Sequence, residues 1–152
     1  MIASKKLGLA GHAFRQDLAH ALTTATPKIE VDIYGFGGNA IQDKRHALDP
    51  YDYTLVVENA FIGNYVTEKI MDAYLGFCQP IYFGAANVQD FFPAKVIQGP
   101  TRSVDSAVTS IKETIQNRPC RADIIQNRHA VMFENNLFYL LRNQLERYYS
   151  SC

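Results

Sequence analysis

The sequence predicts a three-layer α/β domain built around a parallel sheet, and three observations lead to this fold class. Short runs typical of strands alternate along the chain with longer runs of helical periodicity. Strands separated by helices pair in parallel, because each helix carries the chain back across the sheet. At 152 residues the chain is long enough to bury one core, so we expect a single domain over residues 1–152.

The expected elements follow one another in a regular order. The expected strands are short apolar or alternating runs over residues 7–10, 29–34, 53–57, 81–83 and 96–97. The expected helices cover residues 14–22, 68–75, 104–116 and 122–149. Glycine-rich turns are expected at 35–38 and 84–87. Thr67 is a good N-cap for the helix over 68–75, and Gly76 is expected to close it.

Composition and charge exclude several classes of protein. The 15 basic residues balance the 15 acidic ones, so the net charge favours neither nucleic acid nor anionic lipid as a partner. No apolar run approaches the ~18 residues of a membrane span, so membrane association would need segments outside this chain. The three cysteines have no metal-like spacing, and Cys78 is expected to be a buried apolar residue. We therefore expect a cytoplasmic protein.

Two cations are expected at the starts of helices, where a positive charge is unfavourable. Lys69 would lie in the first turn after Thr67, and Arg15 in the first turn of the helix that follows the first strand. Both helix starts would lie at the carboxyl edge of one parallel sheet, where the two cations would clamp a diphosphate. The alternative is that each cation is a solvated surface residue, paired at times with Asp17 or Asp72.

Several motifs occur in a fixed order along the chain. They are Val31-Asp32-Ile33-Tyr34-Gly35, Leu48-Asp49-Pro50-Tyr51-Asp52-Tyr53, the pair Glu58-Asn59, the block Asn64-Tyr65-Val66-Thr67-Glu68-Lys69-Ile70 and the run Pro80-Ile81-Tyr82-Phe83-Gly84-Ala85. Upstream of them, Arg15 precedes an apolar helix. In this order the motifs resemble those of the α-1,3/1,4-fucosyltransferase family, glycosyltransferase family 10. The resemblance covers roughly residues 5–145.

The resemblance implies a fold and a ligand. The chain would be the carboxyl-terminal, Rossmann-like half of a GT-B glycosyltransferase and would bind GDP-fucose. Carried over by position, Arg15 and Lys69 would hold the diphosphate. Glu68 would accept hydrogen bonds from sugar or ribose hydroxyls, and Asn59 and Tyr65 would line the donor pocket. In this family the acceptor domain and its general-base carboxylate precede this region, so we expect neither here and identify no catalytic residue.

The resemblance also implies a reaction, the transfer of fucose from GDP-fucose to a glycan acceptor with inversion. The absent amino-terminal domain would hold that acceptor. Charge grows on the leaving GDP as the glycosidic bond breaks, and fixed cations stabilise it. The chain contains no Asp-x-Asp run, so Arg15 and Lys69 would replace the metal ion that other transferases use. We therefore expect neither a metal nor a cofactor.

Other functions remain open at this point. One is a GDP-sugar-binding module with no activity of its own, and another is a related transferase that uses a different GDP-sugar, since no residue identifies the sugar. A flavodoxin- or receiver-like signalling domain would need an acidic cluster at strand ends, and none appears. The four histidines form no ligand cluster by spacing, and only His12 lies in a loop near Arg15 where a ligand would be in reach.

Overall fold

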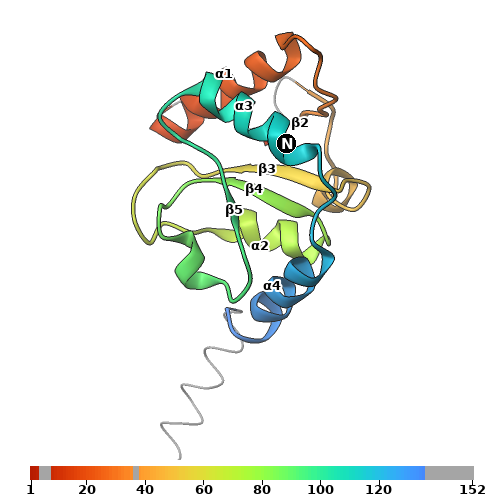
Figure 1. Ribbon diagram of the computed structural model, residues 1–152, viewed down its shortest axis with the longest axis vertical. Helices are drawn as coiled ribbons and strands as arrows, with labels where there is room; N and C mark the ends of the chain where they lie inside the picture. Colours follow the sequence, from red (N-terminus) through yellow and green to blue (C-terminus); the bar gives the residue numbers. More distant parts are fainter. Residues whose placement is uncertain (4–7, 36–37, 136–152) are drawn as a thin grey trace, which may run out of the picture.

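The computed structural model describes residues 1–3, 8–35 and 38–135, and it has the expected α/β architecture (Figure 1). The strands are β1 (Ile2–Ala3), β2 (Tyr34–Gly35), β3 (Tyr53–Val57), β4 (Gln79–Phe83) and β5 (Ile97–Gln98). The α-helices are α1 (Ala10–Thr24), α2 (Glu68–Leu75), α3 (Val104–Ile115) and α4 (Arg121–Phe133). Two short 3₁₀ helices cover Lys44–Ala47 and Val88–Phe91.

The strands form two parallel sheets. In the larger sheet β3, β4 and β5 lie side by side in that order, and the register pairs Tyr53 with Gln79 and Val57 with Phe83. Strands β1 and β2 form a separate pair. Among the described residues β3 is therefore an edge strand, with one side free of strand pairing. The predicted parallel arrangement is confirmed, although it is divided between two sheets.

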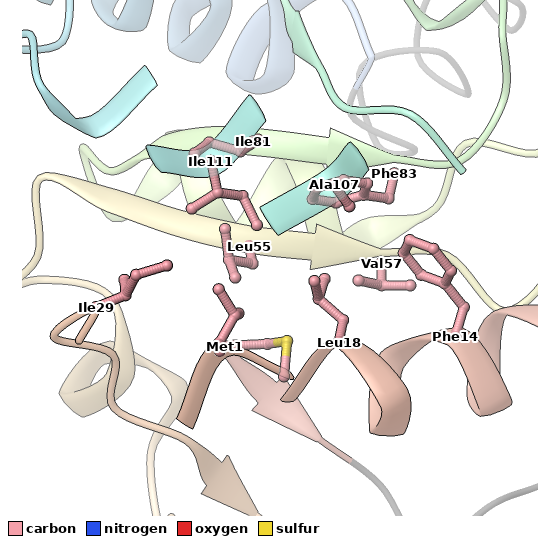
Figure 2. Close-up of a cluster of buried hydrophobic side chains, with 11 residues drawn as sticks. Met1, Phe14, Leu18, Ile29, Leu55, Val57, Ile81, Phe83, Ala107 and Ile111 are labelled. Atoms are coloured by element: carbon pink, nitrogen blue, oxygen red, sulfur yellow. The ribbon is translucent and has the colours of Figure 1, made fainter. Parts of the chain in front are cut away.

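Helices cover both faces of the three-stranded sheet, as Figure 1 shows, with α1 and α3 on one face and α2 and α4 on the other. Leu55 and Val57 of β3 pack with α1 and α3 (Figure 2), whereas Val56 packs with α2 and α4. Successive side chains of a strand point to opposite faces, so one strand contributes to both cores. The predicted three-layer fold is confirmed.

Two elements that border the site have the bounds that the sequence predicts. Strand β3 covers Tyr53–Val57 and helix α2 covers Glu68–Leu75. Both carry a strong local signal, since the strand is a run of β-branched and aromatic residues and the helix lies between a cap residue and a glycine. Thr67 and Gly76 occupy the two cap positions, although the Thr67 hydroxyl does not bond to the helix backbone.

The first helix and the first strands differ from the predictions. Helix α1 begins at Ala10, four residues before the predicted start at Phe14, and residues 8–10 form no strand. Leu7, the first residue of the strand predicted there, lies outside the described residues. Of the alternating run over 29–34, only Tyr34 belongs to a strand, β2, which pairs with β1.

The later elements differ mainly at their ends. Strand β5 lies one residue beyond the predicted run over 96–97. The helix predicted over 122–149 is observed as α4, which ends at Phe133. The N–H groups of Glu134 and Asn135 both donate to the Ala130 carbonyl over 2.8 Å, so the regular i→i−4 pattern stops there. Residues 136–152 lie outside the described residues.

Cys78 is a buried apolar residue, as predicted. Its side chain is fully enclosed, and burial raises the pKa of the thiol to about 12. Because the thiolate is the reactive form of cysteine, a thiol with so high a pKa is not a nucleophile at neutral pH.

Candidate functional site

A cavity of about 280 Å³ lies along the free edge of β3. Its lining comes from β1, α1, β3, α2 and the 3₁₀ helix over Lys44–Ala47 with the residues next to them. It includes four of the five predicted ligand residues, namely Arg15, Asn59, Glu68 and Lys69. The described residues that line the cavity do not include Tyr65, the fifth. A volume of this size is near the lower end of the ~300–1,000 Å³ of small-molecule sites. The cavity thus brings together residues from two helices that are far apart in the sequence.

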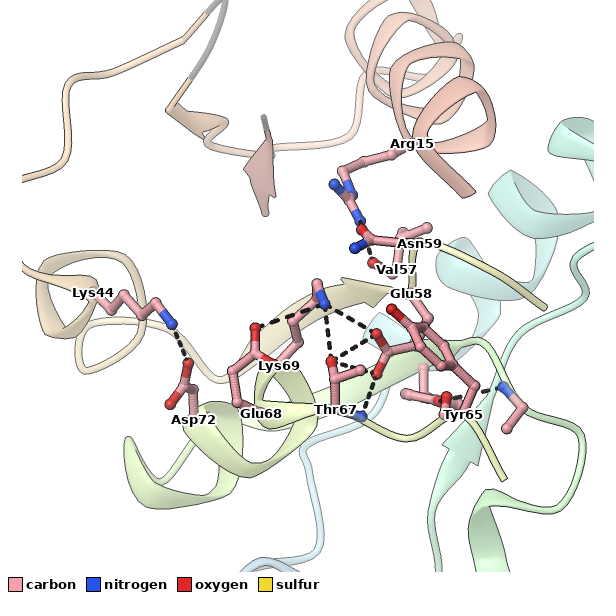
Figure 3. Close-up of polar contacts among 12 residues, drawn as sticks. Arg15, Lys44, Val57, Glu58, Asn59, Tyr65, Thr67, Glu68, Lys69 and Asp72 are labelled. Atoms are coloured by element: carbon pink, nitrogen blue, oxygen red, sulfur yellow. Dashed lines mark hydrogen bonds and ion pairs between the residues drawn. The ribbon is translucent and has the colours of Figure 1, made fainter. Parts of the chain in front are cut away.

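The two residues that follow β3 face opposite helices (Figure 3). The two-residue alternation of the strand continues past its end. Asn59 contacts Arg15 of α1, whereas Glu58 contacts Lys69 of α2. One short segment therefore presents an amide to the first helix and a carboxylate to the second.

Arg15 is a buried cation held against the end of β3. Its side chain is 5% exposed, and its guanidinium donates to the Val57 carbonyl and, over 3.1 Å, to Oδ1 of Asn59. Burial lowers the pKa of the guanidinium and the charge of Glu58 opposes this shift, yet an arginine stays protonated. The prediction that Arg15 lies in the first helical turn is wrong, because α1 begins at Ala10. The helix dipole therefore penalises Arg15 little.

Gly11 allows the start of α1 to touch the backbone that follows β3. Its N–H donates to the Asn59 carbonyl over 3.0 Å. A Cβ atom at Gly11 would lie 1.8 Å from the carbonyl oxygen of Glu58, so no side chain fits there. This close approach fixes the position of α1 against β3 and thereby directs Arg15 to the cavity.

Lys69 lies in the first turn of α2, as predicted, and is paired with a buried carboxylate. Its Nζ lies 3.1 Å from Oε2 of Glu58 and donates over 2.8 Å to Oγ1 of Thr67. Glu58 is fully buried and also accepts hydrogen bonds from the backbone N–H and the hydroxyl of Thr67. The Thr67 hydroxyl is therefore used in this network and does not cap α2. The Lys69 side chain keeps 27% of its surface exposed and lines the cavity.

Glu68 adds an acceptor to the same cavity. Its Oε1 lies 3.7 Å from Nζ of Lys69. Burial raises the pKa of Glu68, but its own backbone N–H and the charges of Lys69 and Lys44 lower the pKa by more than burial raises it. The net pKa of Glu68 is therefore below its ordinary value. Its charged carboxylate accepts hydrogen bonds from hydroxyl groups. Tyr65, by contrast, is not among the residues that line the cavity, and its backbone carbonyl accepts a hydrogen bond from the Tyr82 hydroxyl over 3.3 Å.

The sequence analysis missed the roles of Glu58, Gly11 and Lys44. The alternation of β3 was a signal for Glu58, because Glu58 follows Val56 toward α2. No pattern pointed to Lys44, whose Nζ lies 2.6 Å from Oδ2 of Asp72 at the cavity. Asp72 was an alternative partner for Lys69 or Arg15, and in the structure it pairs with Lys44.

Among the described residues, the charged side chains that line the cavity are three cations and two carboxylates, and they belong to Arg15, Lys44, Lys69, Glu68 and Asp72. Within residues 1–3, 8–35 and 38–135, no three His, Cys, Asp or Glu side chains are grouped as metal ligands. Over the same ranges no helix has both the length and the apolar character to cross a membrane.

A family model matches the part of the chain that builds this cavity. Residues 9–97 match the C-terminal part of glycosyltransferase family 10 (fucosyltransferase). These residues are more than half of the chain and run from α1 through α2 to the start of β5. The chain belongs to glycosyltransferase family 10. The resemblance found in the sequence motifs is thereby confirmed.

Curated relatives align with short parts of the chain. The alpha-(1,4)-fucosyltransferase of Arabidopsis thaliana is 48% identical over 54 residues, which are 35% of this chain and 14% of that protein. The alpha-(1,3)-fucosyltransferase FucT of Helicobacter pylori is 36% identical over 77 residues, which are 49% of this chain and 16% of that protein. The aligned part therefore spans about a sixth or less of these relatives.

Two crystal structures of family 10 enzymes share the fold. An alpha1,3-fucosyltransferase with GDP-fucose has a TM-score of 0.59 and 25% identity, over 84% of this chain and 38% of that chain. A second alpha1,3-fucosyltransferase structure has a TM-score of 0.58 and 26% identity, over 84% of this chain and 36% of that chain. The α/β fold predicted as part of a GT-B transferase is confirmed.

Proposed function

We propose that this chain binds GDP-fucose as the donor domain of a fucosyltransferase. The observation that carries the proposal is that Arg15 and Lys69, from two different helices, line one cavity at the edge of β3. A diphosphate in the cavity would meet a guanidinium on one side and an ammonium on the other, and such charge-assisted bonds are the strong ones. The relative crystallised with GDP-fucose supports the same class of ligand.

The two cations also suit the reaction that we propose. In an inverting transfer of fucose to a glycan, negative charge develops on the leaving GDP, and preorganised cations stabilise it as it forms. Arg15 and Lys69 would supply this stabilisation in place of a metal ion. Glu68 and Asn59 would contact hydroxyl or amide groups of the donor, and Tyr65 would adjoin the donor pocket. The acceptor and the general base would belong to a separate domain, because the chain spans 36–38% of its solved relatives.

Calorimetry with GDP, UDP and ADP tests the ligand. We expect GDP to bind, GDP-fucose to bind with an affinity that comes mostly from its GDP part, and the other two nucleotides to bind more weakly. UDP binding as tight as GDP would overturn the guanine assignment. Titration of GDP with and without EDTA tests the metal independence, and a clear loss of affinity on chelation would point to a metal site.

Two alternatives lead to different results in simple assays. A GDP-sugar-binding module would bind GDP without supporting transfer when the chain is joined to an acceptor domain of a relative. A transferase for another sugar would bind GDP-mannose more tightly than GDP-fucose. Equal affinity for GDP-mannose and GDP-fucose would mean that this cavity recognises the nucleotide and not the sugar.

A further inference from the structure

Among the described residues, His12 is the buried polar side chain whose nitrogen atoms have no hydrogen-bond partner. Its side chain is 5% exposed, and neither Nδ1 nor Nε2 has a hydrogen-bond partner among the described residues. It lies in the first turn of α1 and lines the same cavity as Arg15 and Lys69. Buried polar groups are nearly always hydrogen-bonded, so an orphaned imidazole facing a cavity indicates a partner that enters the cavity.

The surroundings of His12 favour an anionic partner. His12 and Arg15 are three residues apart on α1, so their side chains lie on the same face of the helix. An imidazole always carries at least one N–H donor, and the oxygens of a phosphate are acceptors only. An oxyanion drawn to Arg15 would therefore also supply the acceptor that His12 lacks.

We propose that His12 is a further ligand-binding residue of this cavity and donates a ring N–H to a phosphate oxygen of the bound nucleotide. This rests on the proposed function, since it assumes that a phosphorylated ligand occupies the cavity. The phosphate would then have three donors in the cavity, and two of them, Arg15 and His12, belong to α1.

The variants His12→Leu, His12→Asn and His12→Gln test the proposal in the 152-residue chain. Calorimetry should give a GDP affinity about ten- to a hundredfold lower for His12→Leu, because one hydrogen bond to a charged group is lost. Guanosine, which has no phosphate, should bind all variants equally. One of the two amide variants should recover most of the GDP affinity, because its NH₂ can stand in for one ring N–H. The melting temperature of His12→Leu should not fall, since the substitution removes an unpaired buried polar group.

Three results would overturn the proposal. Unchanged GDP affinity in His12→Leu would mean that the imidazole is satisfied by water or plays no part in binding. An equal loss for guanosine would place the contact on the nucleoside. If neither His12→Asn nor His12→Gln recovered GDP affinity, the loss in His12→Leu would not be due to a hydrogen bond.

Inorganic pyrophosphate separates this proposal from the proposed function. The ring ¹H–¹⁵N signals of His12 should shift when pyrophosphate is added to the unsubstituted chain. A shift with pyrophosphate but no binding of GDP would overturn the GDP-fucose assignment and leave His12 as an anion ligand. GDP binding without any change in the His12 signals would overturn the role of His12 alone. Absence of both responses would overturn both proposals.

Discussion

The starts of α1 and α2 each bring a cation to the same cavity, but they hold it in different ways. Arg15 is buried in the second turn of α1 and donates to two neutral oxygens, the Val57 carbonyl and the Asn59 amide. Lys69 is partly exposed in the first turn of α2 and pairs with the buried carboxylate of Glu58. A ligand anion at Lys69 would therefore share the ammonium with Glu58, whereas at Arg15 it would share the guanidinium with the Val57 carbonyl and the Asn59 amide.

The two cations therefore differ in their structural partners, and the partner determines how much stability the removal of each cation costs. A neutral carbonyl that loses its donor costs the energy of one hydrogen bond. A buried carboxylate that loses its cation keeps an uncompensated charge, which costs considerably more. The following substitutions test this contrast, from the largest expected effect to the smallest.

The largest effect is expected from removing both cations. The double variant Arg15→Ala/Lys69→Ala loses two charge-assisted hydrogen bonds worth roughly 1.5–3 kcal/mol each. The GDP affinity measured by calorimetry should therefore fall by about a hundredfold to ten-thousandfold. The matched control is Lys95→Ala, which removes an exposed cation on the loop before β5. Equal GDP affinity in the double variant and the control would end the diphosphate assignment.

The next effect separates the two roles of Lys69. The substitution Lys69→Ala should lower the free energy of unfolding by about 1–3 kcal/mol, because it leaves Glu58 buried and charged. This is less than the ~3–5 kcal/mol of a fully buried pair, since the Lys69 side chain is partly exposed to water. Chemical denaturation measures the change.

A second substitution removes the cause. Adding Glu58→Gln to Lys69→Ala should restore much of the stability, while the GDP affinity stays low. The same Glu58→Gln change added to Arg15→Ala should restore less, because Arg15 donates to the oxygens of Val57 and Asn59 in addition to feeling the charge of Glu58. Equal recovery in both backgrounds would contradict the contrast between the two helix starts.

The smallest effect is expected at Lys44, the third cation of the cavity. Its bond to Asp72 is largely exposed, with 55% of the Lys44 side chain accessible, and exposed pairs contribute about 0–1 kcal/mol. Lys44→Ala should therefore change the free energy of unfolding by no more than this amount and the GDP affinity by less than tenfold. A larger loss of GDP affinity would make Lys44 a member of the diphosphate site.

Strong local signals made part of this molecule predictable from the sequence. The bounds of β3 and α2 followed from a β-branched run and from a cap residue and a glycine. These signals lie within the elements themselves and do not depend on distant parts of the chain. Family motifs lie on or next to the same elements, and Asn59, Glu68 and Lys69 line one cavity with Arg15 of α1. That these residues bind a ligand stays a prediction.

The rest depended on contacts that no local pattern records. The true start of α1 is associated with a backbone contact between Gly11 and Asn59, 48 positions apart in the sequence. The partner of Lys69 was missed because Glu58 belongs to a different element, and the alternation of β3 indicates which face Glu58 takes but not which residue it meets there. Strands of two residues, such as β1, are too short to show any periodicity.

The two-residue period of β3 has a consequence for insertions and deletions. Loss of one residue within the strand would exchange the two residues that follow it, so that the carboxylate of Glu58 met Arg15 and the amide of Asn59 met Lys69. The guanidinium would then be neutralised by a full negative charge, and the ammonium would lose its buried counter-ion. The length of this strand, as much as the identity of the residues after it, determines which of the two cations the carboxylate of Glu58 meets.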